Sequence, residues 1–192
     1  MSDTVVGEDG LARCPWGAST PDYLSYHDEE WGRPVHGTRL LYERLSLEAF
    51  QSGLSWITIL RKRPAFRAAF AGFDPKTVAA FDETDVARLM ADVGIVRNRA
   101  KVDATIANAR AILDLDTDLD ALLWSFAPDA STRPAPVDRD DVPAVTPEST
   151  AMAKELRRRG FRFVGPTTAY ALMQATGMVN DHLADCAFRP TP

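Results

Sequence analysis

The sequence predicts an all-α protein built from short helices around one apolar core. Apolar residues recur at helical spacing from residue 38 onward, and no segment sustains the alternation typical of a strand. Glycine and proline divide the chain into helix-length pieces. The 192 residues are 45% hydrophobic, and a chain of this size can bury about 70% of its unfolded surface. We therefore expect a single domain over residues 1–192, in which two helical lobes share a core and residues 1–12 form a flexible tail.

The first helices are predicted from apolar stripes. Two sets of residues fall near such stripes: Leu40, Leu41, Leu45 and Leu47, and then Ile57, Leu60, Phe66 and Phe70. Pro64 and residues 72–75 are expected to break this region into short helices, with Asp74 and Asp82 as N-caps. Further helices are expected over residues 82–93, 97–113 and 117–126.

The composition then changes over residues 128–147, which hold five prolines and a run of aspartates. No helix or central strand survives that density of proline, so this segment is expected to be a surface loop. Helix is expected to resume with Thr146 as N-cap and Pro147 in the first turn. It should stop before residues 160–165 and restart at Pro166, ending near Gly177.

Charge and cysteine content restrict the class of protein. The net charge of −5 disfavours nucleic-acid binding, but basic residues cluster at residues 61–63, 97–101 and 157–162, so one basic face is compatible with it. The alternative, which holds for most such runs, is that they are solvated helix faces. Two cysteines are too few for the disulfide framework of a small secreted domain. No signal peptide or membrane span is evident, and we expect a cytoplasmic protein.

The ligand set of a structural zinc site is present near the two ends of the sequence, in Cys14, His27, His182 and Cys186. The spacing of His182 and Cys186 would place both side chains on one face of a helix. Structural zinc takes four nitrogen or sulfur ligands in a tetrahedron. Taken separately, each pair is also explained by a buried thiol and a core histidine. The remaining histidine, His36, is expected on the surface of a loop.

Aromatic residues crowd a short, loop-like segment around the first two of these ligands: Trp16, Tyr23, Tyr26 and Trp31. Trp56 follows on a helix, and Glu48 stands among apolar neighbours between Leu47 and Phe50. A buried carboxylate needs a partner, so Glu48 and the aromatic rings together could line a slot for a flat, polar-edged ring. The alternatives are that the rings fill the core and that Glu48 is exposed beside the apolar stripe.

A helix, a tight turn and a second helix follow the proline-rich segment. Gly160 can adopt the left-handed conformation that ends a helix, and the next helix presents free N–H groups suited to a phosphate. Arg162 and the arginines at 157–159 add positive charge. The same pattern is common as a simple packing unit.

Five ordered motifs span about residues 13–190: Arg13-Cys14-Pro15-Trp16, Tyr26-His27-Asp28-Glu29-Glu30-Trp31-Gly32, Gly53-Leu54-Ser55-Trp56, Gly160-Phe161-Arg162-Phe163-Val164-Gly165 and Val179-Asn180-Asp181-His182. Together they closely resemble the DNA-3-methyladenine glycosylase I family. The resemblance implies a helix-hairpin-helix glycosylase fold. It implies one structural zinc ion held by the two cysteines, His27 and His182. It also implies a pocket in which Trp16, Tyr23, Tyr26 and Trp56 surround a flipped base.

In that pocket the resemblance makes Glu48 the catalytic residue and the acceptor for the exocyclic amine of the base. It implies that Leu54 fills the gap in the duplex and that Gly160, Arg162 and Gly165 contact DNA. The implied activity is hydrolysis of the N-glycosidic bond of 3-methyladenine in alkylated double-stranded DNA, the first step of base excision repair, by a monomeric enzyme. Asp181 and Asp185 flank a zinc ligand and are expected to support it rather than act on the sugar.

Two other functions remain open at this stage. A non-enzymatic zinc module that binds damaged DNA or a protein would need the four metal ligands but not Glu48. A glycosylase for 3-methylguanine or an unmethylated lesion would differ only in the shape of its pocket.

Overall fold

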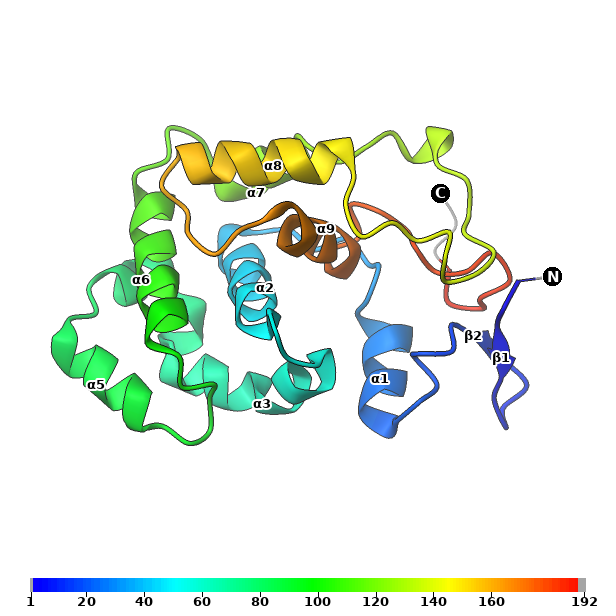
Figure 1. Cartoon of the computed structure of the whole chain (residues 1–192), viewed down its shortest axis with the longest axis horizontal. Coiled ribbons are helices and arrows are strands. Elements are labelled where there is room, and N and C mark those ends of the chain that lie inside the picture. The colour runs from blue at the N-terminus through cyan, green and yellow to red at the C-terminus, as the bar shows by residue number, and fades with distance from the viewer. Residues whose placement is uncertain (1, 190–192) are drawn as a thin grey trace.

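The computed structural model describes residues 2–189 and is built mostly from helices (Figure 1). This confirms the predicted fold class. In chain order the elements are β1 (Val5–Val6), β2 (Ala12–Arg13), α1 (Pro21–Glu29), α2 (Thr38–Gln51), α3 (Trp56–Ala69), η1 (Ala71–Phe73), α4 (Pro75–Ala79), α5 (Glu83–Ala91), α6 (Arg99–Leu113), α7 (Leu119–Trp124), η2 (Ala130–Thr132), α8 (Pro147–Arg158) and α9 (Pro166–Ala175).

Helix α2 lies at the centre of the molecule, where it contacts α3, α6, α7 and α9 (Figure 1). Its Leu41, Leu45 and Phe50 are completely buried in the main apolar core. Leu40 is 52% exposed and does not belong to the buried stripe, contrary to the prediction. A helix surrounded on most sides loses its simple amphipathic pattern, because polar positions such as Ser46 are also buried.

Side chains begin the helices where the sequence predicts. Asp74 accepts a hydrogen bond from the Thr77 amide at 2.9 Å. Asp82 and Thr146 each cap a helix in the same manner, and both take part in a capping box. These three N-caps are confirmed, and each satisfies amide groups that have no partner within the helix.

Two local predictions were wrong. Pro64 lies inside α3 instead of ending it. Proline in a helix interior costs about 3 kcal/mol, and complete burial of Ile59 and Phe66 on the same helix offsets that cost. The aromatic segment around residues 14–31 is not a loop throughout, because α1 forms within it. Thr20 caps this helix and Pro21 occupies its first turn.

The N-terminal segment has defined contacts where the sequence predicted a flexible tail over residues 1–12. Strands β1 and β2 pair antiparallel, with Val5 opposite Arg13. The Ser2 amide donates to the Asp185 carboxylate at 2.8 Å, and the Asp3 amide donates to the Val137 carbonyl. These partners are distant in sequence, so local composition could not indicate them; Met1 lies outside the described residues. Within residues 2–189, no helix has both the length and the apolar character required to cross a membrane.

Candidate active site and metal centre

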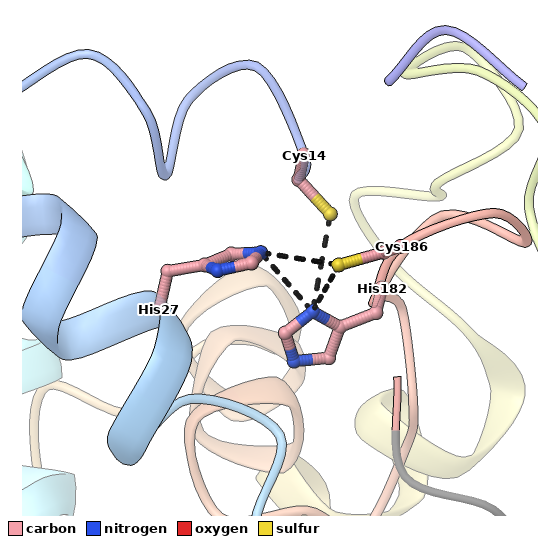
Figure 2. Close-up of side chains that lie close together, drawn as sticks. All are labelled: Cys14, His27, His182 and Cys186. Atoms are coloured by element: carbon pink, nitrogen blue, oxygen red, sulfur yellow. Dashed lines mark hydrogen bonds between the residues drawn. The ribbon is translucent and has the colours of Figure 1, made fainter. Parts of the chain in front are cut away.

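Four side chains from the two ends of the described chain converge in one buried cluster (Figure 2). The ligand atoms of Cys14, His27, His182 and Cys186 all lie within 4.8 Å of one another. Nδ1 of His182 is 3.2 Å from Nε2 of His27 and 3.5 Å from Sγ of Cys186. Neighbouring ligands of a tetrahedral zinc ion are about 3.3–3.8 Å apart. Sγ of Cys14 is slightly farther, 3.9 Å from Nδ1 of His182. The donor set therefore fits Zn²⁺, and the separations around His182 are close to those of a zinc site.

The outer nitrogen of each histidine is already hydrogen-bonded. Nδ1 of His27 lies 2.7 Å from the Asp28 carboxylate, and Nε2 of His182 lies 3.0 Å from the Trp31 carbonyl. Because these oxygens only accept, both outer nitrogens carry the proton, and both inner nitrogens present a lone pair to the cluster. Arg13 holds Asp28 in turn, with Nε 3.0 Å from its carboxylate.

Asp28 was missed by the sequence analysis, although its position next to His27 was an available signal. The predicted supporting role of Asp181 and Asp185 is wrong, since neither hydrogen-bonds His182 in the described residues. Asp185 binds Ser2 instead. The helical spacing predicted for His182 and Cys186 is also wrong, because this segment forms turns that bring the two side chains together.

The cluster is packed tightly enough to require glycine at one neighbouring position. A Cβ atom at Gly17 would lie 2.5 Å from Cγ of His27. The two thiols are close enough to hydrogen-bond, which raises the pKa of Cys14 and lowers that of Cys186.

A pocket of about 750 Å³ opens beside the cluster. Its wall includes every predicted base-binding residue together with others that the sequence analysis did not assign to it: Asp3, Cys14, Pro15, Trp16, Tyr23, Tyr26, Trp31, Glu48, Gln51, Trp56, Arg139, Val142, Ala171, Gln174, Asp181 and Leu183. Gln51 and Gln174 carried no signal in the sequence beyond proximity to motifs, and Asp181, which lies within a motif, was assigned to the metal site instead of the pocket. The structure thus brings the aromatic segment, α2 and α9 to one cavity.

Aromatic rings form much of this pocket and hold each other in place. Trp16 packs edge-on to Tyr23 with ring centroids 5.6 Å apart, and Tyr26 packs on Trp56 at 5.5 Å. The Tyr23 hydroxyl accepts a hydrogen bond from the Ile57 amide at 3.0 Å, which joins α1 to the first turn of α3. A rigid wall of this kind suits a flat, apolar-faced ligand.

Glu48 is one of the carboxylates of the pocket wall and is only 6% exposed, so the alternative that it is exposed beside the apolar stripe is wrong. No hydrogen bond reaches its carboxylate from residues 2–189. Burial raises the pKa of Glu48 to about 8, an effect that the positive charge of Arg44 opposes. An uncompensated carboxylate of this kind would gain most from a ligand that brings a donor or a positive charge.

Asp181 is likewise buried at the pocket wall, but its oxygens are fully engaged. They accept hydrogen bonds from Tyr170 at 2.5 Å, from Gln174 at 2.9 Å and from Arg133 at 2.9 Å. Arg133 comes from the proline-rich segment, which thus joins α9 to the chain that carries His182. With these partners in place, Asp181 is suited to shaping the pocket.

The aspartates of the proline-rich segment stabilise a turn at the pocket. The Asp138 and Asp141 side chains accept backbone amides within residues 137–141. This turn places Arg139 at the pocket wall, close to Val142. A segment with no predicted role therefore forms part of the site.

The turn between α8 and α9 is fixed to the core by a buried side chain of α6. Gly160 has φ +91°, the left-handed conformation predicted for it. The buried Asn108 side chain accepts from the Arg162 amide at 2.7 Å and donates to the Arg162 carbonyl at 3.1 Å. The Arg162 side chain is exposed and forms no ion pair within the described residues. Beyond Gly165 the surface is open, since a Cβ there would meet no atom within 4 Å.

The arginines before this turn contribute less free charge than the sequence suggests. Arg158 pairs with Glu155 at 2.6 Å, and Arg159 pairs with both Glu155 and Asp116.

The turn between α2 and α3 carries Leu54, which is 39% exposed.

A sequence model of the protein family described as methyladenine glycosylase matches residues 16–190 of this chain. The chain belongs to the methyladenine glycosylase family. This confirms the resemblance found in the sequence motifs. A family relative, DNA-3-methyladenine glycosylase 1 of Escherichia coli K12, is 44% identical over 183 residues, which are 94% of this chain and 98% of the relative.

Solved structures of methyladenine glycosylases share the fold. One, of 3-methyladenine DNA glycosylase I, superposes with a TM-score of 0.86 at 45% identity and covers 93% of this chain and 100% of that one. A second, of the Staphylococcus aureus enzyme and described with the structural basis of 3-methyladenine recognition, has a TM-score of 0.85 at 34% identity. It covers 94% of this chain and 97% of that one.

Proposed function

We propose that this protein is a monofunctional DNA glycosylase that hydrolyses the N-glycosidic bond of 3-methyladenine in alkylated double-stranded DNA, the first step of base excision repair. One observation carries the proposal: an aromatic pocket contains a buried carboxylate, Glu48, that has no hydrogen-bond partner in the described residues. The names of the similar proteins support the same substrate.

A base in a duplex must leave the stack before an enzyme can reach its glycosidic bond. In the proposed complex the flipped base lies among Trp16, Tyr23, Tyr26 and Trp56, and Glu48 accepts a hydrogen bond from its exocyclic amine. Methylation at N3 makes the nucleoside cationic, so the base departs neutral and needs little acid catalysis. Ionised Glu48 then pairs with the cation, whereas unmethylated adenine offers the amine without the charge.

The cluster offers four nitrogen and sulfur ligands, the number that a structural zinc ion takes, so a bound ion would have no open position for water or substrate. We therefore propose one structural zinc ion, held by Cys14, His27, His182 and Cys186. Its contribution is to tie the N-terminal segment to the C-terminal segment beside the pocket, and the hydrolysis itself depends on other residues.

The proposed function is tested by incubating the purified protein with methylated duplex DNA and identifying the released base by chromatography. Release of 3-methyladenine is expected. Release of a different base would show that the enzyme is specific for another lesion. Binding to DNA without release of any base would favour a non-enzymatic zinc module.

The proposed DNA contacts are Leu54, which fills the gap left by the flipped base, and the turn with Gly160, Arg162 and Gly165. Pro166 removes one amide from the start of α9, so Arg162 is expected to supply much of the attraction to phosphate. In Arg162→Glu, affinity for a duplex with an abasic site should fall, and the slope of log K against log salt should decrease by about 1.

Lys154→Glu is the matched control for this prediction. It makes the same change of charge on α8, at an exposed residue away from the turn. If Arg162→Glu bound abasic duplex with the wild-type affinity and an unchanged salt slope, the turn would not belong to the DNA interface.

A further inference from the structure

A charged cluster lies next to the pocket residue Glu48. Glu30, which follows α1, accepts a hydrogen bond from Nη2 of Arg44 at 2.6 Å. It accepts two more from Arg63 on α3, each at 2.7 Å. Burial alone would raise the pKa of Glu30, but these hydrogen bonds lower it to about 2, so this carboxylate stays ionised. Two guanidinium groups thus share one carboxylate, which leaves an excess positive charge.

Arg44 lies one helical turn before Glu48 on α2, a spacing that places both side chains on the same face. The Arg44 side chain is 11% exposed, and its Nη1 is buried without a hydrogen-bond partner among residues 2–189. The two residues form no salt bridge with each other. A fixed positive charge and an unpartnered carboxylate therefore face the same buried region without a salt bridge between them.

We infer that Arg44, held by Glu30, is a positioning residue whose charge favours the carboxylate form of Glu48, the form that pairs with a cationic base. This inference rests on the proposed function. It assigns a task to a residue that does not line the pocket. Ionised Glu48 attracts a methylated, cationic nucleoside more than a neutral one, so the charge of Arg44 contributes to selectivity as well as to rate.

Other charged and titratable groups surround Glu48, and Arg44 is the cation that acts on it directly. Tyr26 lines the same pocket from α1 and remains a neutral phenol, because burial raises its pKa far above the usual value. The remaining groups of the charged cluster and the pocket wall are Glu30, Arg63, Tyr23, Asp181, Cys14, Asp3 and Arg139. Of these, Asp181 is already paired with Arg133.

The pH dependence follows from the sign of these interactions. Burial raises the pKa of Glu48 and Arg44 opposes that rise, so loss of Arg44 should raise the pKa further. Each unit of that rise reduces the ionised fraction about tenfold at pH values below both pKa values. The reduction disappears at pH values above both.

The test measures kcat/KM for excision from methylated DNA between about pH 6 and 10, which extends above both pKa values, since this constant reports ionisations of the free enzyme. In Arg44→Met the acid limb should move upward by about one pH unit, which is about tenfold slower excision on that limb. The two profiles should converge at high pH. Arg44→Lys, which keeps the charge, should restore the wild-type profile.

Arg63→Gln is the matched control, because it removes a positive charge from the same Glu30 without a direct effect on Glu48. Its acid limb should move less than that of Arg44→Met. If Arg44→Met does not fold, Arg44→Gln replaces it, since Gln can still donate to Glu30. A variant slowed equally at every pH, or one with an unchanged profile, would overturn the inference.

Titration of the Glu48 carboxyl by NMR in wild type and Arg44→Gln makes the test independent of activity. A higher midpoint in the variant is expected, and equal midpoints would refute the role of Arg44. Absence of excision by the wild type would instead count against the proposed function, so the two failures are distinguishable.

Discussion

Replacing Cys186 by alanine is expected to abolish metal binding and to lower the free energy of unfolding by several kcal/mol. Only three ligands would remain, and at a site of this kind metal-binding energy is largely folding energy. The lost site also joins the segment of Cys14 to the segment of His182, next to the pocket. Native mass spectrometry should show one zinc ion per wild-type chain and none in the variant, and thermal unfolding should show the loss of stability.

The control for this prediction is His36→Ala. His36 is outside the metal cluster, and its side chain is 61% exposed, although it bonds Asp120. This variant should keep both the ion and nearly all of its stability. A wild-type protein that is folded and equally stable after treatment with a chelator would contradict the structural role of the metal.

Glu48→Gln should slow excision of 3-methyladenine more than it weakens binding to an abasic product. The amide keeps the shape and one acceptor oxygen but lacks the charge, which matters most when the cationic nucleoside is bound and the bond breaks. Losing one charged hydrogen bond costs roughly 1.5–3 kcal/mol, or about ten- to a hundredfold in rate. Glu48→Ala should weaken both excision and binding. Single-turnover kinetics measure the first effect.

Two observations would check this assignment. The pH dependence attributed to Glu48 should be absent from Glu48→Gln, because the amide does not titrate. Glu43→Gln provides a matched control, since Glu43 is another buried carboxylate on α2 that pairs with Arg67 and does not line the pocket. Its excision rate should remain near the wild-type value. Equal rates for wild type and both Glu48 variants would remove Glu48 from the active site.

Much of the fold and the metal cluster could be predicted from local signals. Helix-capping residues such as Thr146 act on the next few amides, so their effect is visible in sequence. The four metal ligands were recognisable because cysteine and histidine are rare in this chain. The burial of Glu48 was not predictable from spacing, since both faces of α2 are covered by other helices.

Interactions between distant elements could not be predicted in the same way. Arg44 on α2 donates a hydrogen bond to Glu30, which follows α1, and no periodicity indicates that pair. The pairing of Arg159 with Asp116 reduced a basic run that looked free in the sequence. Contacts of this kind depend on the tertiary arrangement, and they determine the charge around the site.

The metal cluster also has a consequence for the kinetics of folding. Cys14 and His182 are separated by 168 positions. Contacts between such distant residues require closure of a very long loop, so they tend to form after local helix pairs have assembled. Interactions that are absent from the folding transition state slow unfolding without accelerating folding. We therefore expect the zinc site to form late in folding. Removal of zinc should increase the unfolding rate and leave the refolding rate nearly unchanged, so the metal determines the lifetime of the native state.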